Sequence, residues 1–388
     1  MSGIPLTVLD LVPISTGSTA AQALRNSIDL AREAEEAGYT RYWFAEHHLN
    51  PGVAGTSPAV LIALVAAQTD RIRLGSGAVQ LGHRTALATV EEFGLLDAMY
   101  PGRIDLGLGR SGGRNLPGSG SAGSAGSAGS AGSAGSADEP PAGRVTENGL
   151  LIPPRFSLEK LLASPRFGLY KELLQQPKAE SQDYAEQTAV IQSLLAGTYR
   201  SATGAEAHVI PGEGAAVQIW ILGSSGGESA RIAGGRGLRF AANYHVSPGT
   251  VFDAVEGYRD AFQPSDDLAK PYVSVSADVV VAEDDATARD LAAGYGAWVR
   301  SIRTAEGAIQ FPTAAEAAGF AWSDEDRALV ADRVDTQFTG SAKTVADKLE
   351  ILQEATGADE LIITTITHDH ADRVRSYQLL AEEWYGRV

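Results

Sequence analysis

Glu46, His47 and His48 directly follow an apolar run, and they are the side chains in this sequence best suited to chemistry. A carboxylate beside two imidazoles can transfer protons near neutral pH or bind a metal ion. Successive residues of a strand point to opposite faces, so a regular strand directs at most one of the two imidazoles into a shared site. A zinc site needs three converging protein ligands, which favours proton transfer over a metal site. Alternatively, a histidine here has only a structural role, packed at the strand end and bonded to a carbonyl.

Two glycine-rich motifs follow apolar runs and suit a phosphate group. Gly107–Gly112 reads GLGRSG and matches a dinucleotide-binding pattern, but we expect no helix directly after it, which argues against that function. The residue of this motif that suits phosphate binding is Arg110, whose guanidinium can pair with a phosphate. Leu222–Ser229 reads LGSSGGES and leads into a predicted helix, where amides and hydroxyls converge on an anion unless the segment is an ordinary turn. The residues of this predicted anion site are Ser224, Ser225, Gly226, Gly227 and Ser229.

These candidate residues follow short apolar runs that predict strands. The eight expected strands are Leu6–Val12, Arg41–Ala45, Ile72–Gln80, Ile104–Leu108, Gln218–Leu222, Leu238–Ala242, Tyr272–Val281 and Glu360–Thr365. Helical patterns separate them, so the sheet should be parallel. Eight such units favour an α/β fold, a closed (β/α)8 TIM barrel in a single domain of residues 1–388, over an open sheet with two inserts. In such a barrel the chemistry lies at the C-terminal ends of the strands.

Two segments interrupt this alternation. Residues 114–182, after the fourth strand, are low in complexity and rich in proline, and residues 304–340 form a second insert that we expect to be irregular. Within the first insert, Gly118–Ala137 repeats Gly, Ser and Ala, which predicts a flexible coil. We expect this tract to be a spacer or lid edge, or else a tolerated surface insertion.

Helix ends carry recognisable signals. Thr19 with Gln22 predicts a helix start, and Gly38 predicts its end. Asp369, within the sequence HDHAD, is interpreted as the N-cap of the last helix and not as a metal ligand.

Composition excludes several classes of protein. The formal net charge of -17 argues against nucleic acid and anionic membrane surfaces as partners. The chain has no cysteine, which excludes disulfides and thiol catalysis. No apolar run approaches the length of a membrane span, so we expect a soluble, cytoplasmic protein.

The sequence resembles the bacterial-luciferase-like, flavin-dependent monooxygenases, and is most similar to the single-chain branch that includes natural-product tailoring oxygenases. The matching segments are AEHH (45–48), LGSGAVQL (74–81), EEFGLLDAMYPGRIDLGLGR (91–110) and ILGSSGGESARIAGGRGL (221–238). The resemblance implies a two-component enzyme that takes reduced FMN from a separate reductase. O2 would add at flavin C4a, and the hydroperoxide would oxygenate a hydrophobic small molecule, for example in antibiotic biosynthesis. Family members often dimerise through barrel helices, so a homodimer is one option that the resemblance offers, but the sequence shows no surface patch for it.

The resemblance also implies roles for individual residues. His47 matches the histidine beside the reactive flavin carbon, with a pKa expected near the working pH, and Glu46 and His48 match its neighbours. Gly77 and Ala78 match a dipeptide that lies against the isoalloxazine and is a cis peptide in several members. The positions that match phosphate-holding residues are Arg110, Gly226, Gly227 and Ser229.

The loop after Leu81 departs from the family pattern. Family members commonly read Pro-Asn-His-Ser-Pro there, whereas Gly82–Ala86 reads GHRTA. That loop borders the substrate side, so a substrate cannot be carried over from the family. Two alternatives stay open: a deazaflavin-dependent (F420-type) oxidoreductase and a non-catalytic flavin-binding protein.

Overall fold

The strands close on themselves because the first strand pairs with the last. In the computed structural model, which describes residues 3–110, 143–176, 179 and 182–387, β1 (Leu6–Asp10) pairs in parallel with β2 (Arg41–Phe44) and β12 (Glu360–Thr364). The other strands of the barrel are β3 (Arg73–Ser76), β5 (Ile104–Gly109), β8 (Gln218–Gly223), β9 (Arg239–Asn243) and β10 (Val273–Ala282). Each of these barrel strands pairs in parallel with its neighbours. The predicted TIM barrel is confirmed.

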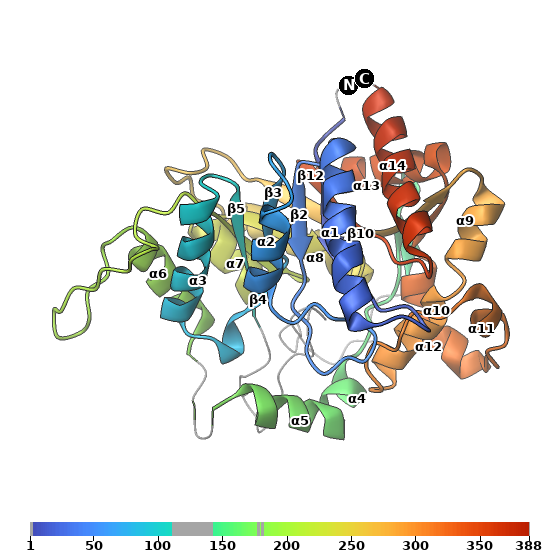
Figure 1. Ribbon diagram of the computed structural model, residues 1–388, viewed down its shortest axis with the longest axis horizontal. Helices are drawn as coiled ribbons and strands as arrows, with labels where there is room; N and C mark the ends of the chain where they lie inside the picture. The colour runs from blue at the N-terminus through green and yellow to red at the C-terminus, as the bar shows by residue number, and fades with distance from the viewer. Residues whose placement is uncertain (1–2, 111–142, 177–178, 180–181, 388) are drawn as a thin grey trace.

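Helices surround the strands (Figure 1). They are α1 (Ala20–Glu36), α2 (Pro58–Ala66), α3 (Ala86–Met99), α6 (Tyr184–Leu195), α7 (Glu228–Gly235), α8 (Val251–Ala261), α9 (Asp285–Leu291), α10 (Tyr295–Arg303), α13 (Ala342–Thr356) and α14 (His370–Gly386), with 3-10 turns η1 (Leu81–His83) and η2 (Pro248–Thr250). The predicted caps are present: the Thr19 side chain accepts from the Gln22 amide, and Asp369 accepts from the Ala371 amide. Gly38 has φ +91, a conformation that glycine adopts without strain. None of the helices in these described ranges is long and apolar enough to cross a membrane.

Two predicted elements are divided in the structure. The expected strand Ile72–Gln80 splits into β3 and β4 (Val79–Gln80), with Gly77 and Ala78 between them. The helical pattern that follows the predicted strand Tyr272–Val281 forms two helices, α9 and α10, divided beside Gly294. A Cβ at Gly294 would lie 2.9 Å from the Phe311 ring, so this close approach needs glycine.

The inserts contain regular structure where they are described. The first holds a small antiparallel pair and two helices: β6 (Arg144–Val145), β7 (Leu151–Ile152), α4 (Glu159–Leu162) and α5 (Pro165–Leu174). The prediction for Gly118–Ala137 falls outside the described residues. The second insert is not irregular, since it contains α11 (Ala314–Ala318), α12 (Asp324–Val334) and β11 (Phe338–Ser341). Capping boxes begin both helices, and β11 extends the sheet beside β10.

The barrel interior is filled from its N-terminal end. Arg41 lies there, with Nη1 2.7 Å from Asp105 Oδ2 and Nε 3.1 Å from Glu360 Oε1. Above this layer the rings of Trp43 and Trp220 meet edge to face, with centroids 4.9 Å apart. These side chains close the lower part of the barrel and leave room for a site only at the C-terminal mouth. In Figure 1, α4 and α5 lie across that end of the barrel.

Candidate active site

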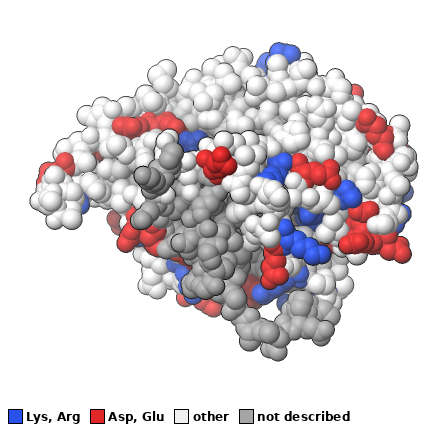
Figure 2. Space-filling view, turned by 90° about the horizontal axis from the view of Figure 1, so that it is seen from below, with Lys and Arg blue, Asp and Glu red and all other residues white. Residues whose placement is uncertain are grey.

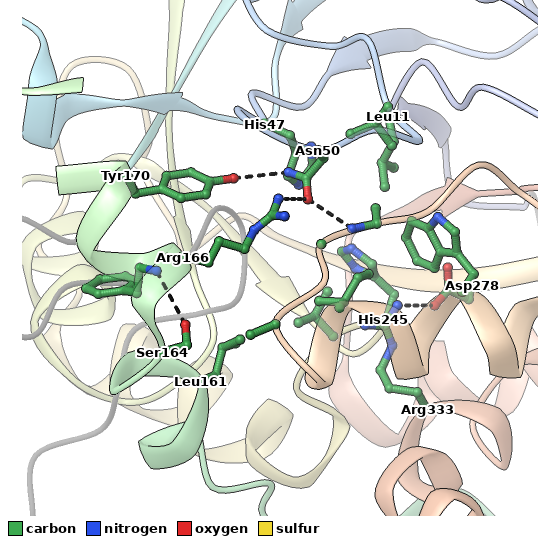
Figure 3. Close-up of a pocket in the computed structure, with 18 residues that line it drawn as sticks. Leu11, His47, Asn50, Leu161, Ser164, Arg166, Tyr170, His245, Asp278 and Arg333 are labelled. Carbon is green, nitrogen blue, oxygen red and sulfur yellow. Dashed lines mark hydrogen bonds and ion pairs between the residues drawn. The ribbon is translucent and has the colours of Figure 1, made fainter. Parts of the chain in front are cut away.

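His47 lies just beyond β2 and lines a cavity at the mouth of the barrel (Figure 3). Its backbone N–H donates to the Gly55 carbonyl at 2.7 Å, and its side chain is buried. Burial, and then the neighbouring His48, lower the pKa of His47 to about 4 although Glu46 opposes the shift. His47 is therefore neutral at pH 7, and the expectation of a pKa near the working pH was wrong.

Glu46 accepts hydrogen bonds from the loop that departs from the family pattern. Its Oε1 lies 2.9 Å from Nε2 of His48 and 2.9 Å from Nε2 of His83. Its Oε2 accepts from the Gln80 amide at 3.0 Å, and Arg84 Nε lies 3.5 Å from Oε1. Burial alone would raise the pKa of Glu46, but the two imidazoles, Arg84 and the Gln80 amide outweigh it and lower the pKa to about 2.

Glu46, His48 and His83 also form a possible set of metal ligands. One ligand atom from each lies within 4.8 Å of the others. The Arg84 guanidinium, however, already places a fixed positive charge beside the same carboxylate oxygen. A divalent ion there would face that charge at close range, so the arrangement favours a hydrogen-bonded cluster over a metal centre.

Gly77 and Ala78 lie at the mouth between β3 and β4 and are joined by a cis peptide bond. The Gly77 amide donates to the Phe44 carbonyl at 2.7 Å. A Cβ at Gly77 would lie 2.7 Å from Leu9 Cδ1, so no side chain fits on that face. The dipeptide thus presents bare backbone close to the end of β2.

The LGSSGGES segment runs from the end of β8 into α7, and Arg110, directly after β5, reaches it. Arg110 Nη1 lies 2.6 Å from Oε2 of Glu228, the first residue of α7. Gly227 precedes the helix without a side-chain cap, and the buried Ser229 hydroxyl has no hydrogen-bonding partner within the described ranges. This set of donors suits a phosphate. Gly226 also packs closely, because a Cβ there would lie 2.5 Å from the Asp253 carbonyl oxygen.

The cavity beside His47 has a volume of about 850 Å³, counting the space open to solvent at its mouth. Its walls are mainly apolar, and its polar lining includes His245 and Asp278 from the barrel and Arg333 from α12. Nδ1 of His245 lies 2.6 Å from Oγ of Ser276. Burial lowers the pKa of His245 to about 3, helped by Arg333 and His47, so this imidazole is also neutral.

Asn50 connects three segments around the cavity (Figure 3). Its Nδ2 donates to the His48 carbonyl at 2.8 Å and to the Tyr170 hydroxyl at 3.1 Å. Its Oδ1 accepts from the Ala308 amide at 3.0 Å and from Arg166 at 2.9 Å. The end of β2, α5 and the loop after α10 are thereby held together as walls of one cavity.

Sequence reasoning missed several residues that line this cavity. His245 follows a predicted strand, and that position was a signal, but nothing separated it from a packed histidine. Asp278 lies within a buried strand, and Arg333 lies in an insert that was expected to be irregular. Asn50 and Arg166 carried no sequence signal, because their contacts join segments more than 100 residues apart.

A closed eight-stranded parallel barrel with buried titratable side chains and an apolar cavity at its C-terminal mouth defines a TIM-barrel enzyme. The chain belongs to the luciferase-like monooxygenase family, whose model matches residues 4–120 and 166–360. It is therefore an oxidoreductase by family. The resemblance stated from the sequence is confirmed at this level.

Individual proteins extend this similarity over almost the whole chain. YvbT of Bacillus subtilis is 35% identical over 385 residues, covering 98% of this chain and 97% of YvbT. A luciferase-like monooxygenase of Escherichia coli is 32% identical, covering 97% and 96%. The crystal structure of apo-MsnO8 superposes with a TM-score of 0.75 at 30% identity, covering 98% of each chain.

More distant structures share the fold alone. A 3,6-diketocamphane monooxygenase component in complex with FMN has a TM-score of 0.63 at 18% identity, covering 99% of each chain. An F420-dependent secondary alcohol dehydrogenase has a TM-score of 0.58 at 13% identity, covering 98% of this chain and 99% of that protein.

Proposed function

We propose that the protein is a flavin-dependent monooxygenase that uses reduced FMN and O2 to insert one oxygen atom into a hydrophobic organic substrate. The flavin would arrive from a separate reductase and leave after reoxidation. Family membership supports the reaction class, and the apolar cavity beside His47 supports a hydrophobic substrate.

The observation that carries this proposal is the position of His47. It is the one member of the Glu46–His48 segment that lines the cavity, and it is neutral at pH 7. A neutral imidazole can accept a proton and return it, so His47 is assigned the proton transfer that accompanies oxygenation. Glu46 and His48 are assigned positioning roles, since their side chains bond to each other, away from the cavity lining.

The donors at the ends of β5 and β8 fit the phosphate of FMN. The unpartnered Ser229 hydroxyl, the uncapped start of α7 and the Arg110 guanidinium are all suited to bind an oxyanion. We assign phosphate binding to Arg110, Ser224, Ser225, Gly227 and Ser229, with Gly226 placing the loop against α8. The backbone at Gly77 and Ala78 is assigned to the isoalloxazine. When bound, reduced flavin supplies the electrons that activate O2, while the surrounding apolar residues exclude water.

Product analysis with reduced FMN tests the proposal. The full chain, a flavin reductase, NADH, FMN and O2 are incubated with panels of aldehydes, aromatic polyketides and organic acids. Incorporation of one atom of 18O from 18O2 into a product is the expected result. Product formation without O2 would instead favour a deazaflavin-type reductase. O2 uptake that never exceeds flavin autoxidation with any substrate would favour a flavin-binding protein.

We further propose that the protein forms a homodimer through α2 and α3. Both helices carry large apolar side chains on their outer faces, among them Leu64 on α2 and Met99 on α3. The two helices pack against each other, and we propose that these side chains share one face of the molecule. A second copy of the same surface would cover them.

A further inference from the structure

The positive charges of the side chains that line the cavity outnumber the negative charges. Two guanidinium groups, those of Arg166 and Arg333, and one carboxylate, that of Asp278, face it. Both lining histidines are neutral at pH 7, because burial holds the pKa of His47 at about 4 and that of His245 at about 3. One positive charge is therefore uncompensated at the edge of a mainly apolar cavity, in a chain whose formal net charge is -17.

That charge belongs to Arg166. Arg333 is already matched: its Nη2 lies 3.1 Å from Asp278 Oδ2, and its Nε donates to the Tyr295 hydroxyl at 3.0 Å. Asp278 and Arg333 thus form a buried, internally neutral pair. Arg166 has no carboxylate partner within the described part of the chain, and its three hydrogen bonds go only to uncharged oxygens.

The surroundings of Arg166 fix its guanidinium at the rim of the cavity. It reaches from α5 and donates to the carbonyls of Leu49 and Glu306 and to Oδ1 of Asn50 (Figure 3). A Cβ at Gly307 would lie 2.1 Å from its Nη2, so glycine at that position leaves room for the guanidinium. The Glu306 carboxylate pairs with Arg300 instead, at 3.4 Å. The Nε–H of Arg166 has no acceptor within the described residues and is available to a ligand.

The other side chains that line the cavity indicate the chemical character of the rest of the ligand. Leu161 and Phe167 come from the same insert as Arg166, and Trp298 and Ile302 come from α10. These apolar side chains favour a hydrocarbon or aromatic body. On the described part of this face, basic and acidic groups are interspersed (Figure 2).

We propose that the cavity binds an organic carboxylic acid, with its apolar body directed toward His47 and its carboxylate held by Arg166 at the rim. This deepens the proposed function, on which it rests for treating the cavity as the substrate site. A single carboxylate matches the single uncompensated charge. The planar guanidinium fork suits carboxylate oxygens, and partial exclusion of water strengthens the contact.

Matched pairs of acids and amides test this without flavin or O2. Isothermal titration of the full chain compares decanoate with decanamide, and 4-phenylbutanoate with 4-phenylbutanamide. Within each pair the body is the same and only the charge differs. We expect the wild type to bind the acid about 10-fold or more tightly than the amide, as for a hydrogen bond to a charged group. Acid binding should also weaken as salt is raised.

Variants separate recognition of the charge from the structural role of Arg166. Arg166→Gln should lose the preference for the acid while its affinity for the amide stays within about twofold, because the neutral amide makes no charged contact with the guanidinium. Arg166→Lys, which keeps the charge but loses the fork, should retain an intermediate preference. Arg144→Gln, on the exposed strand β6 and outside the cavity lining, is the control and should behave as the wild type.

Three results would overturn the inference: equal affinity for acid and amide in the wild type, an equal loss of both in Arg166→Gln, or no binding of any acid. If the acids bind through Arg166 but no substrate is oxygenated with reduced FMN, the proposed function fails and the carboxylate site stands. The two claims are therefore tested separately.

Discussion

Nε2 of His48 lies 2.9 Å from Oε1 of Glu46, so the second histidine of the pair bonds to its own segment and not to the cavity that His47 lines. His83 makes the same contact to Oε1, and the His48 and His83 rings meet edge to face with centroids 5.2 Å apart. The carboxylate therefore holds the segment that carries His47. This gives the two histidines different roles, and each role has its own test.

Glu46→Gln should destabilise the protein because the variant removes the charge around which His48, His83 and Arg84 are arranged. We expect a loss of about 2–4 kcal/mol in unfolding free energy, since the remaining polar groups stay buried without their partner. Urea denaturation measures it. Glu354→Gln, exposed on α13, is the matched control and should change stability little. A Glu46→Gln variant as stable as the wild type would contradict the positioning role.

His47→Ala should abolish oxygenation while leaving flavin binding nearly intact. Loss of a proton-transfer group typically costs about 100-fold or more in rate. Product yield per NADH and the FMN dissociation constant are measured side by side. His370→Ala, at the start of α14 and outside the cavity lining, serves as the control. An unchanged product yield in His47→Ala would remove His47 from the mechanism.

The lowered pKa of His47 predicts a specific loss of stability in acid. The unfolded chain binds a proton on this imidazole near pH 6.5, whereas the folded chain does so only near pH 4. Stability is therefore complete above pH 6.5 and falls as the pH drops toward 4, by about 3 kcal/mol for this group. The pKa of Glu46 is also lowered, to about 2, so its contribution is lost only below its ordinary value of 4.5. Between pH 6.5 and 4.5, His47→Gln should lose stability less steeply than the wild type. Parallel curves for the two proteins would refute the assignment.

Much of the fold followed from the sequence because alternation and caps are local. Eight apolar runs separated by helical patterns predict a closed parallel barrel, and Thr19 and Asp369 mark helix starts through contacts within three residues. The second insert was missed for a related reason. Its capping boxes, Thr313 with Glu316 and Ser323 with Asp326, were visible in the sequence, but they stand in polar segments without a strong apolar period.

The site was predictable only where it coincides with a strand end. His47 and Arg110 follow strands, so their general location was expected from the barrel. The walls of the cavity were not, because Arg166, Asn50 and Ala308 meet across long stretches of chain and no spacing rule encodes such a contact. Side-chain pairing was equally inaccessible: the ion pair between Arg110 and Glu228 spans 118 positions.

That ion pair predicts an effect on flavin affinity. The Glu228 carboxylate lies 2.6 Å from Arg110 and would compete with a phosphate for the guanidinium. Glu228→Gln should therefore bind FMN several-fold more tightly, and Arg110→Gln about 10-fold or more weakly, in line with the strength of charged hydrogen bonds. Fluorescence titration with FMN and with riboflavin gives the measurement. Riboflavin lacks the phosphate and should be insensitive to both changes. Equal effects on the two flavins would exclude a phosphate contact.

The cluster of Glu46, His48 and His83 predicts that no metal is required. Treatment with EDTA should leave the melting temperature of the chain unchanged, because Arg84 and not an ion offsets the carboxylate. Elemental analysis of the purified protein should find less than one equivalent of transition metal. A rise in melting temperature with Zn²⁺ that disappears in His83→Gln would show instead that the cluster is a metal site.

The apolar face of α2 and α3 predicts an oligomeric state. Leu95 and Met99 lie one turn apart on α3 and are 57% and 71% exposed, and Leu64 on α2 is 46% exposed. Burying a leucine or methionine side chain typically stabilises by about 1.5–3 kcal/mol, so a second copy gains from covering this face. Sedimentation velocity of the wild type should therefore show a dimer. Leu95→Asp with Met99→Asp should give a folded monomer, since two charges would be buried without partners. Val145→Asp, which changes an equally exposed residue on β6, should remain dimeric. A wild type that sediments as a monomer at micromolar concentration, or a double variant that stays dimeric, would rule out this interface.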